Sequence, residues 1–295
     1  MFIIHKISEI DAGTTLTQFL ISRRFLPLFF YSPYTLTTWL MHQNKSLYLA
    51  QLYDEKALIL HKEKNNDVRF LFTDPSEALL KEVLNHFNPN YIAFNQVVTP
   101  QMHESTDVED CELSTDLNLV VNQNNKEIWN AYNKCIKRHP ELTVCQYKET
   151  DKDSVRIFLE EWSHSRSEEK NKYAKIENDN HFLDTYGNNE EIMGIVVKDG
   201  QKIVAISFAC PSLDQQAIGV INKCLRGYVQ LGIFTFVQRA KLMQSRGFTK
   251  CYIGSINNDF KKKFIHLGNL QSSFSRKIFN EKDFTSHDFY LSRLF

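Results

Sequence analysis

Residues 191–254, EIMGIVVKDGQKIVAISFACPSLDQQAIGVINKCLRGYVQLGIFTFVQRAKLMQSRGFTKCYIG, contain the order of elements that decides the fold. Met193–Val197 and Lys202–Ala209 are apolar and rich in β-branched residues, and Lys198-Asp199-Gly200-Gln201 joins them. Asp-Gly between two such runs is a strong signal of a β-hairpin. We therefore expect two adjacent strands of a meander, followed by a third strand over Gln216–Asn222.

A glycine-containing bend then leads into a helix. After Leu225–Gly232 the apolar side chains recur at helical spacing, Gly247 is suited to end the helix, and Cys251–Gly254 is typical of another short strand. The apolar positions of the helix are Ile233, Phe236, Val237, Ala240 and Met243. A strand, a bend and a helix N-terminus leave backbone N–H groups without acceptors, which favours a phosphate or a developing oxyanion. The sequence therefore predicts an anion-binding site at this bend.

The same order of elements occurs earlier in the chain. Three strand-like runs lie between Leu47 and Phe72, a helix is expected from Thr73 to Phe87, and Tyr91–Val98 is strand-like. The chain thus indicates one α+β unit that occurs twice, each with a mixed, mainly antiparallel central sheet flanked by helices. We place the domain boundaries at residues 1–112 and 113–295.

The remaining segments connect these units. We expect broken helix within residues 1–45, an acidic linker over Thr99–Ser114, a strand over Asp116–Val121, and amphipathic helices over Asn125–Arg138 and Asp153–Ser163.

Composition describes a globular protein. Of the 295 residues 42% are hydrophobic and 13% aromatic, and no apolar run is long enough to cross a bilayer. The N-terminal residues lack the pattern of a secretory signal, so we expect a cytoplasmic protein. The six cysteines include no C-x-x-C pair, which indicates neither a zinc site nor a disulfide framework, and we expect no metal.

Charge is unevenly distributed along the chain. From Gln201 to Phe295 there are 14 Lys and Arg against 5 Asp and Glu, although the whole chain has no net charge. A basic surface attracts phosphate-bearing partners such as a nucleotide tail, tRNA or anionic lipid headgroups. The alternative is a solvated lysine face packed on an acidic neighbouring domain.

Together, five segments resemble the GNAT superfamily, and within it the soluble tandem-domain relatives of the phosphatidylglycerol lysyltransferase C-terminal domain. They are Tyr34–Trp39, Lys126–His139, Gly200–Ala205, Leu225-Arg226 and Asp259–Phe264. The resemblance implies two GNAT-like units. It also implies that a gap between two splayed strands holds an activated acyl donor, either an acyl-CoA or the aminoacyl end of a tRNA.

The resemblance also implies which residues bind the donor, and it shows two departures. Arg226 corresponds to the basic residue after the fourth strand, and Lys261, Lys262 and Lys263 correspond to a basic helix near the groove. Relatives usually place a carboxylate near the end of that strand, whereas this chain has Asn222-Lys223-Cys224. The phosphate-binding loop is also altered, because Gly227 follows Arg226 directly and the next glycine is Gly232.

Three functions remain open from these residues. One, based on the abundance of Phe and Tyr, is a structural or interaction partner that uses the aromatic N-terminal domain; the other two concern the second unit. The first is an acyltransferase-like enzyme that moves an acyl or aminoacyl group to an amine or hydroxyl acceptor. Its candidate catalytic residues are Asn222, Tyr252 and Ser255 at predicted strand ends, and its donor-binding candidates are Arg226, Gly227, Gly232, Lys261 and Lys262. The second is a non-catalytic module that binds an anionic partner such as tRNA, a lipid headgroup or a protein. Peripheral membrane contact is compatible with both, and the oligomeric state is not predicted. Cys224 could be a nucleophile or a small buried residue.

Overall fold

The computed structural model describes residues 1–7, 32, 34, 45–71, 75–98, 110–123, 125–166, 172–212, 215–255, 263–264 and 268–280. The described residues form two compact units. The first unit contains the described residues within 1–27, 39–110 and 272–295. The second contains those within 28–38, namely Ser32 and Tyr34, and those within 111–271. Compactness does not test which part folds independently, so the boundaries at residues 1–112 and 113–295 stay a prediction.

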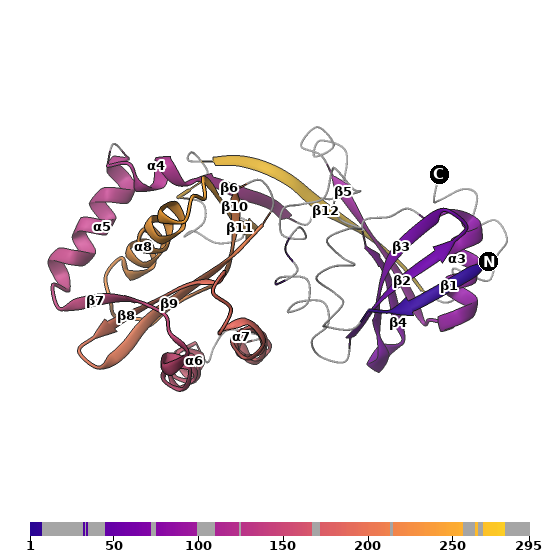
Figure 1. The fold of residues 1–295 in the computed structure, drawn as a ribbon, viewed down its shortest axis with the longest axis horizontal. Helices are drawn as coiled ribbons and strands as arrows, with labels where there is room; N and C mark the ends of the chain where they lie inside the picture. The colour runs from indigo at the N-terminus through magenta and orange to yellow at the C-terminus, as the bar shows by residue number, and fades with distance from the viewer. Residues whose placement is uncertain are drawn as a thin grey trace. The chain divides into compact units, whose positions relative to one another are not determined.

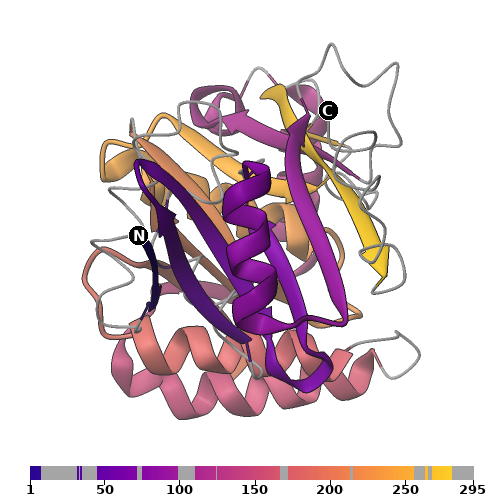
Figure 2. The same cartoon turned by 90° about the vertical axis from the view of Figure 1, so that its right-hand side faces the viewer.

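The first unit is a sheet with one described helix on it. Strand order is β1-β2-β3-β4-β5-β12, and all neighbours are antiparallel except the parallel pair β4 and β5. Figure 2 shows α3 lying across these strands, where its Leu79, Leu80 and Val83 are buried. The elements are β1 (Phe2–Lys6), β2 (Lys45–Leu52), β3 (Glu55–Lys62), the 3-10 turn η2 (Glu63–Asn65), β4 (Asp67–Leu71), α3 (Glu77–Phe87), β5 (Tyr91–Val98) and β12 (Gly268–Asn280).

The second unit is a sheet covered on both faces. Strand order is β6-β11-β10-β9-β8-β7, and only β10 and β11 are parallel. In Figure 1, α5 and α8 lie on one face of β8 and β9, and α6 and α7 lie on the other. The elements are β6 (Asp110–Asp116), α4 (Leu117–Val121), α5 (Lys126–Arg138), β7 (Leu142–Gln146), η4 (Glu149–Asp151), α6 (Lys152–Ser165), α7 (Lys172–Tyr186), β8 (Met193–Asp199), β9 (Lys202–Pro211), β10 (Gln216–Cys224), α8 (Leu231–Ser245) and β11 (Lys250–Ser255).

Apolar burial stabilises this second unit. Phe158, Phe182, Phe208 and Phe236 are at most 2% exposed, and they come from both helical layers and from the sheet between them. Burying one such side chain contributes about 1.5–3 kcal/mol relative to leaving it in water. The core therefore fixes the sheet that carries the candidate site.

Local sequence signals explain several boundaries. Asp199 pairs with Lys202 across the predicted hairpin, and Gly200 has φ +58°, a left-handed conformation that costs glycine little. Asn125 caps α5, because its Oδ1 accepts a hydrogen bond from the Ile128 N–H at 3.1 Å. The α+β class and the mixed, mainly antiparallel sheets of both units are confirmed.

Three expectations are wrong in part. Asp116–Val121 is not a strand, because β6 ends at Asp116, whose Oδ1 accepts from the Asn118 N–H at 2.8 Å and starts α4. The acidic linker is shorter than expected, since residues 110–114 belong to β6. The start of the expected N-terminal helical region is instead β1, which pairs with β2, and most of residues 8–44 lie outside the described residues.

None of the helices within the described ranges combines the length and the apolar character that a membrane crossing needs.

Candidate functional site

β10 and β11 begin as a parallel pair and then separate. Gln216–Ile218 pairs with Lys250–Tyr252, and no further pairs join the two strands. Beyond this point β10 continues to Cys224 against β9, and β11 continues to Ser255 against β6. We call the region where they diverge, residues 219–224 of β10 and 253–255 of β11, the fork.

Both strands of the fork contain a β-bulge where they part. The register of β10 shifts between Gly219 and Ile221, and that of β11 shifts between Tyr252 and Gly254. A bulged residue is left out of the ladder, and bulges re-aim the backbone next to functional sites. The amides of Val220 and Ile253 are therefore candidates for binding a carbonyl oxygen placed in the fork.

The bend after β10 is held by contacts with its surroundings. The Leu225 N–H donates to Val204 O at 2.9 Å, and the Tyr228 hydroxyl donates to Asp199 Oδ2 at 2.8 Å. Burial, together with the Asp199 carboxylate, raises the pKa of Tyr228 to about 12. The Val229 N–H donates to His139 Nε2 at 3.0 Å, so this amide is already used within the protein.

The N-terminus of α8 has no side-chain cap. Its N-cap residue, Gln230, has φ +58° and forms no capping hydrogen bond with its side chain. The N–H groups of Leu231, Gly232 and Ile233 have no acceptor inside the helix, because those of the first turn never do. Together with the helix dipole, they favour a negatively charged group at this end of the fork.

The first unit differs at both corresponding places. All five residues of β4, Asp67–Leu71, pair with β5, so these two strands do not diverge. The N-terminus of α3 is occupied by the protein's own carboxylate: the Ser76 N–H donates to Glu55 Oε1 at 2.6 Å, and the Ser76 hydroxyl donates to Glu55 Oε2. The described part of the first unit therefore offers no equivalent fork.

A carboxylate reaches the end of β10 from another element. Asp179 of α7 is 3% exposed, and its Oδ2 lies 3.2 Å from Lys223 Nζ. The same ammonium lies 4.2 Å from the ring centroid of Trp162 on α6. Asp179 was not among the predicted site residues, because α7 was not predicted from the sequence. The apolar pair Phe182-Leu183, one turn after Asp179, is the signal that could have indicated a buried helix face there.

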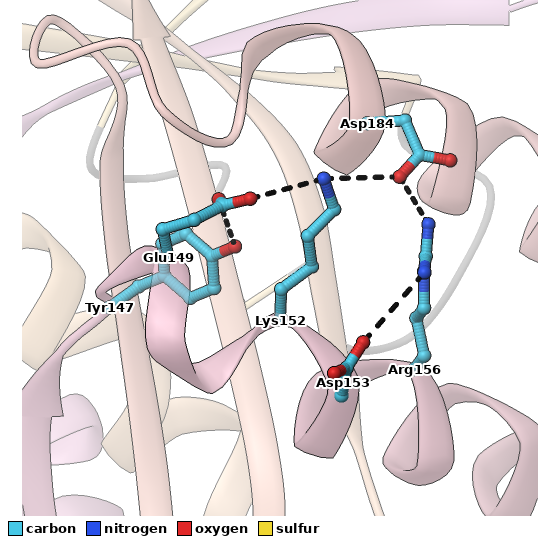
Figure 3. Close-up of polar contacts among 6 residues, drawn as sticks. All are labelled: Tyr147, Glu149, Lys152, Asp153, Arg156 and Asp184. Carbon is cyan, nitrogen blue, oxygen red and sulfur yellow. Dashed lines mark hydrogen bonds and ion pairs between the residues drawn. The ribbon is translucent and has the colours of Figure 1, made fainter.

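Polar contacts hold α7 against α6 (Figure 3). Lys152 Nζ lies 3.2 Å from Glu149 and 3.3 Å from Asp184 of α7. Arg156 contacts Asp184 and lies 3.8 Å from Asp153. The Tyr147 hydroxyl donates to Glu149 at 3.4 Å. Each exposed ion pair contributes little by itself, but together they fix the helix that carries the buried carboxylate.

The predicted catalytic residues lie on the two strands of the fork. Asn222 is on β10, and its Oδ1 is buried without a hydrogen-bond partner among the described residues. Tyr252 is the last residue of β11 that pairs with β10, and it is only 2% exposed. Ser255 ends β11. Burial raises the pKa of the neighbouring Cys224 to about 12, which favours a protonated, structural thiol.

The predicted donor-binding residues lie mainly in the bend. Arg226 and Gly227 are exposed, and Gly227 has φ +95° with open space where a side chain would stand. Gly232 is in the first turn of α8. Lys261 and Lys262 lie outside the described residues. Across the described ranges, no three His, Cys, Asp or Glu side chains gather where they could hold a metal ion.

Sequence comparisons do not place the protein. No protein-family model matches the chain, and no curated protein matches it.

Solved structures do match it over nearly its full length. A conserved protein of unknown function from Bacteroides thetaiotaomicron has a TM-score of 0.70 at 13% identity, covering 93% of this chain and 98% of that one. The C-terminal domain of a putative lysylphosphatidylglycerol synthetase from Agrobacterium fabrum has a TM-score of 0.53 at 13% identity, covering 94% of each chain. A tandem GNAT protein from the clavulanic acid biosynthesis pathway has a TM-score of 0.55 at 7% identity, covering 95% and 98%.

The chain has a tandem GNAT fold. The predicted resemblance is thereby confirmed at the level of the fold, which is the acyltransferase-like fold of these neighbours. Within this tandem GNAT fold the fork lies between β10 and β11 of the second unit.

Proposed function

We propose that the second unit transfers an acyl or aminoacyl group from a carrier, an acyl-CoA or an aminoacyl-tRNA, to an amine or hydroxyl acceptor. The observation that carries the proposal is the fork, where β10 and β11 stop pairing after three residues and both bulge. An extended acyl donor fits between two such strands because unpaired backbone groups on either side can pair with it.

The chemistry needs no covalent intermediate with the protein. The acceptor nitrogen or oxygen attacks the donor's carbonyl carbon, forming the new bond, and the bond from that carbon to the carrier's sulfur or oxygen breaks. The acceptor loses one proton, and the departing thiolate or alkoxide takes one up. Amides aimed at the carbonyl oxygen stabilise the negative charge that develops on it. In the fork, Val220 and Ile253 are the candidates.

Polar side chains around the fork suit the remaining tasks. The buried Asn222 Oδ1 can accept a hydrogen bond from the acceptor's N–H or O–H. The Tyr252 hydroxyl is the candidate to protonate the leaving group, and Ser255 lies further along the same strand. Arg226 and the start of α8, including Gly232, suit the carrier's phosphates. Gly227 gives the bend its left-handed turn, and Lys261 and Lys262 would steer the anionic carrier from their basic segment.

Asp179 is a further candidate for the acid–base role that β10 itself does not provide. Its carboxylate is within 3.2 Å of Lys223, at the end of the strand where relatives place their own carboxylate. The pair also anchors this end of β10 to α6 and α7. Both carriers are cytoplasmic molecules, so we place the reaction in the cytoplasm, with a soluble amine or a membrane lipid headgroup as the acceptor.

The alternative is a non-catalytic unit that binds tRNA, a lipid headgroup or a protein. It is favoured by the sequence Asn222-Lys223-Cys224, which supplies no carboxylate from β10. The two functions differ in turnover, since only an enzyme releases free carrier from a charged donor in the presence of an acceptor.

The test is calorimetric titration of the full chain with acetyl-CoA and with lysyl-tRNA at several salt concentrations. We expect one of them to bind, with affinity and salt dependence both reduced in Arg226→Ala. The matched control is Arg246→Ala, which removes an exposed arginine at the far end of α8. If neither acetyl-CoA nor lysyl-tRNA binds, the proposed acyl donors are wrong. Binding that Arg226→Ala leaves unchanged would contradict the placement of the carrier at the bend.

A further inference from the structure

We infer that Arg239, a buried arginine of α8, is a positioning residue that keeps the fork in the shape that binds the acyl carbonyl. The inference rests on the proposed function and assigns to that site a residue that never touches the substrate.

Arg239 spans the strands where the fork begins. Its Nη1 donates to Phe208 O of β9 at 3.2 Å and to Ile221 O of β10 at 3.3 Å. Its Nη2 lies 4.0 Å from Cys251 Sγ on β11. Phe208 and Ile221 are paired residues immediately beside the bulge at Val220. The guanidinium therefore satisfies the carbonyl groups beside the bulge and reaches the strand from which β10 departs.

Gly219 leaves the room that the guanidinium occupies. A Cβ at this position would lie 2.8 Å from Arg239 Nη2 and 3.1 Å from Nη1. Gly219 is also the residue at which the bulge begins and the first residue of β10 beyond its pairing with β11. Three features thus coincide: the missing side chain, the bulge and the end of strand pairing.

The cost of burying this charge indicates a role other than stability. Arg239 is 2% exposed, and no carboxylate within the described ranges forms an ion pair with it. Its Nε has no hydrogen-bond partner among the same residues. Burial lowers the pKa of the guanidinium, although an arginine remains charged in proteins. Apolar residues can often replace a buried charge without loss of stability, so stability alone does not explain an arginine here. Its contacts with carbonyl groups and a sulfur beside the bulge are consistent with a role in fixing the conformation of the bulge.

The experiment separates a positioning role from general stabilisation by comparing the affinity for a carrier that bears its acyl group with the affinity for the same carrier without it. The full chain is titrated with acetyl-CoA and with CoA, and with lysyl-tRNA and uncharged tRNA. Within each pair, the ratio of the two affinities reports the hydrogen bond to the acyl carbonyl. We expect this hydrogen bond to make the acylated form bind about tenfold more tightly. In Arg239→Met and Arg239→Lys we expect this affinity ratio to fall to about one. The affinity for the carrier without its acyl group, CoA or deacylated tRNA, should change by less than about threefold. Arg246→Met, at the residue that follows the end of α8, should keep the wild-type ratio.

Two outcomes would overturn the positioning role. One is a wild-type ratio in Arg239→Met, and the other is an equal loss of affinity for both forms of the carrier. If Arg239→Met does not fold, Gly219→Ala decides, because it keeps the arginine but displaces it, and a wild-type ratio in that variant overturns the inference.

If the wild-type protein binds neither carrier, the proposed function fails by itself. Amide hydrogen exchange of residues 219–224 then tests Arg239 independently. We expect exchange about tenfold faster in Gly219→Ala and Arg239→Met, because Phe208 O and Ile221 O lose the guanidinium donor and, among the described residues, only Ile221 O retains a side-chain donor, the Ser207 hydroxyl. Unchanged exchange in both variants contradicts the inference.

Discussion

Replacing Asp179 by alanine leaves the Lys223 ammonium at the end of β10 without its carboxylate. The two charged atoms are 3.2 Å apart, and the side chains are 13% and 4% exposed, so water replaces the lost partner poorly. Removing one member of a buried ion pair is far more costly than removing one member of a surface pair. We therefore expect Asp179→Ala to destabilise the protein strongly.

The magnitude follows from the geometry. At an effective dielectric constant of about 20, two unit charges at this separation attract by about 5 kcal/mol. The Trp162 ring lies 4.2 Å from the ammonium with or without Asp179, so this cation–π contact is common to both proteins and does not offset the loss. Because the Lys223 side chain is still 13% exposed, water recovers part of the lost attraction. The expected loss in the free energy of unfolding is about 3 kcal/mol, which lowers Tm by about 6–12 °C for a unit of this size.

Urea denaturation of Asp179→Ala, Lys223→Met and the double variant Asp179→Leu/Lys223→Met tests this magnitude. The double variant should regain most of the lost stability, because it leaves no charge buried. The control is Glu161→Ala, which breaks the exposed pair with Lys202, whose side chains are 44% and 53% exposed, and should cost less than about 1 kcal/mol. Equal losses in Asp179→Ala and Glu161→Ala, or a double variant no more stable than Asp179→Ala, would refute the reasoning.

Three further predictions concern other parts of the fold. Glu55→Ala removes the carboxylate that binds Ser76 at the N-terminus of α3; we expect a loss of about 1–2 kcal/mol in urea denaturation, and a loss below 0.3 kcal/mol would contradict the capping role. Gly200→Ala places a side chain at φ +58° with no clash, so a cost of about 1 kcal/mol, seen as a lower urea midpoint, reflects backbone strain alone, and a stabilised variant would disprove it. Burial raises the pKa of Cys210 to about 12 in the folded protein, whereas a cysteine in the unfolded chain has a pKa of about 8.5. Above about pH 8.5 the unfolded chain therefore loses this proton first, and the free energy of unfolding falls as pH rises toward 12. Unfolding measured from pH 8 to 10.5 should show a steep loss, up to about 1.4 kcal/mol per pH unit for one thiol, that Cys210→Ala reduces; an identical slope in that variant would be inconsistent with a buried neutral thiol.

Local signals in the sequence predicted much of the sheet. The hairpin at Asp199-Gly200, the strand Tyr91–Val98 and the helix capped by Asn125 each depend on a few neighbouring residues. The structure confirms these elements because turn chemistry and apolar periodicity act over short distances along the chain. The Leu-Val-Val sequence in residues 117–121 favours a strand, but these residues form a helix because the cap from Asp116 outweighs their strand propensity.

The central parts of the candidate site depend on contacts between distant residues. That β10 leaves β11 after Ile218 follows from bulges in two strands more than 30 residues apart. Arg239 lies on the apolar face of α8 next to Phe236 and Ala240, where periodicity predicts an apolar residue rather than a charge. Asp179 and Lys223 meet only because α7 packs beside β10. Single-sequence patterns do not encode these pairings.

The most direct measurement of the central claim is amide hydrogen exchange of the full chain with and without a bound carrier, acetyl-CoA or lysyl-tRNA. We predict slower exchange in residues 219–232, which cover one strand of the fork, the bend and the start of α8, and unchanged exchange at the start of α3 in the first unit. Protection confined to α3, or no protection at the fork by a carrier that binds, would contradict this claim.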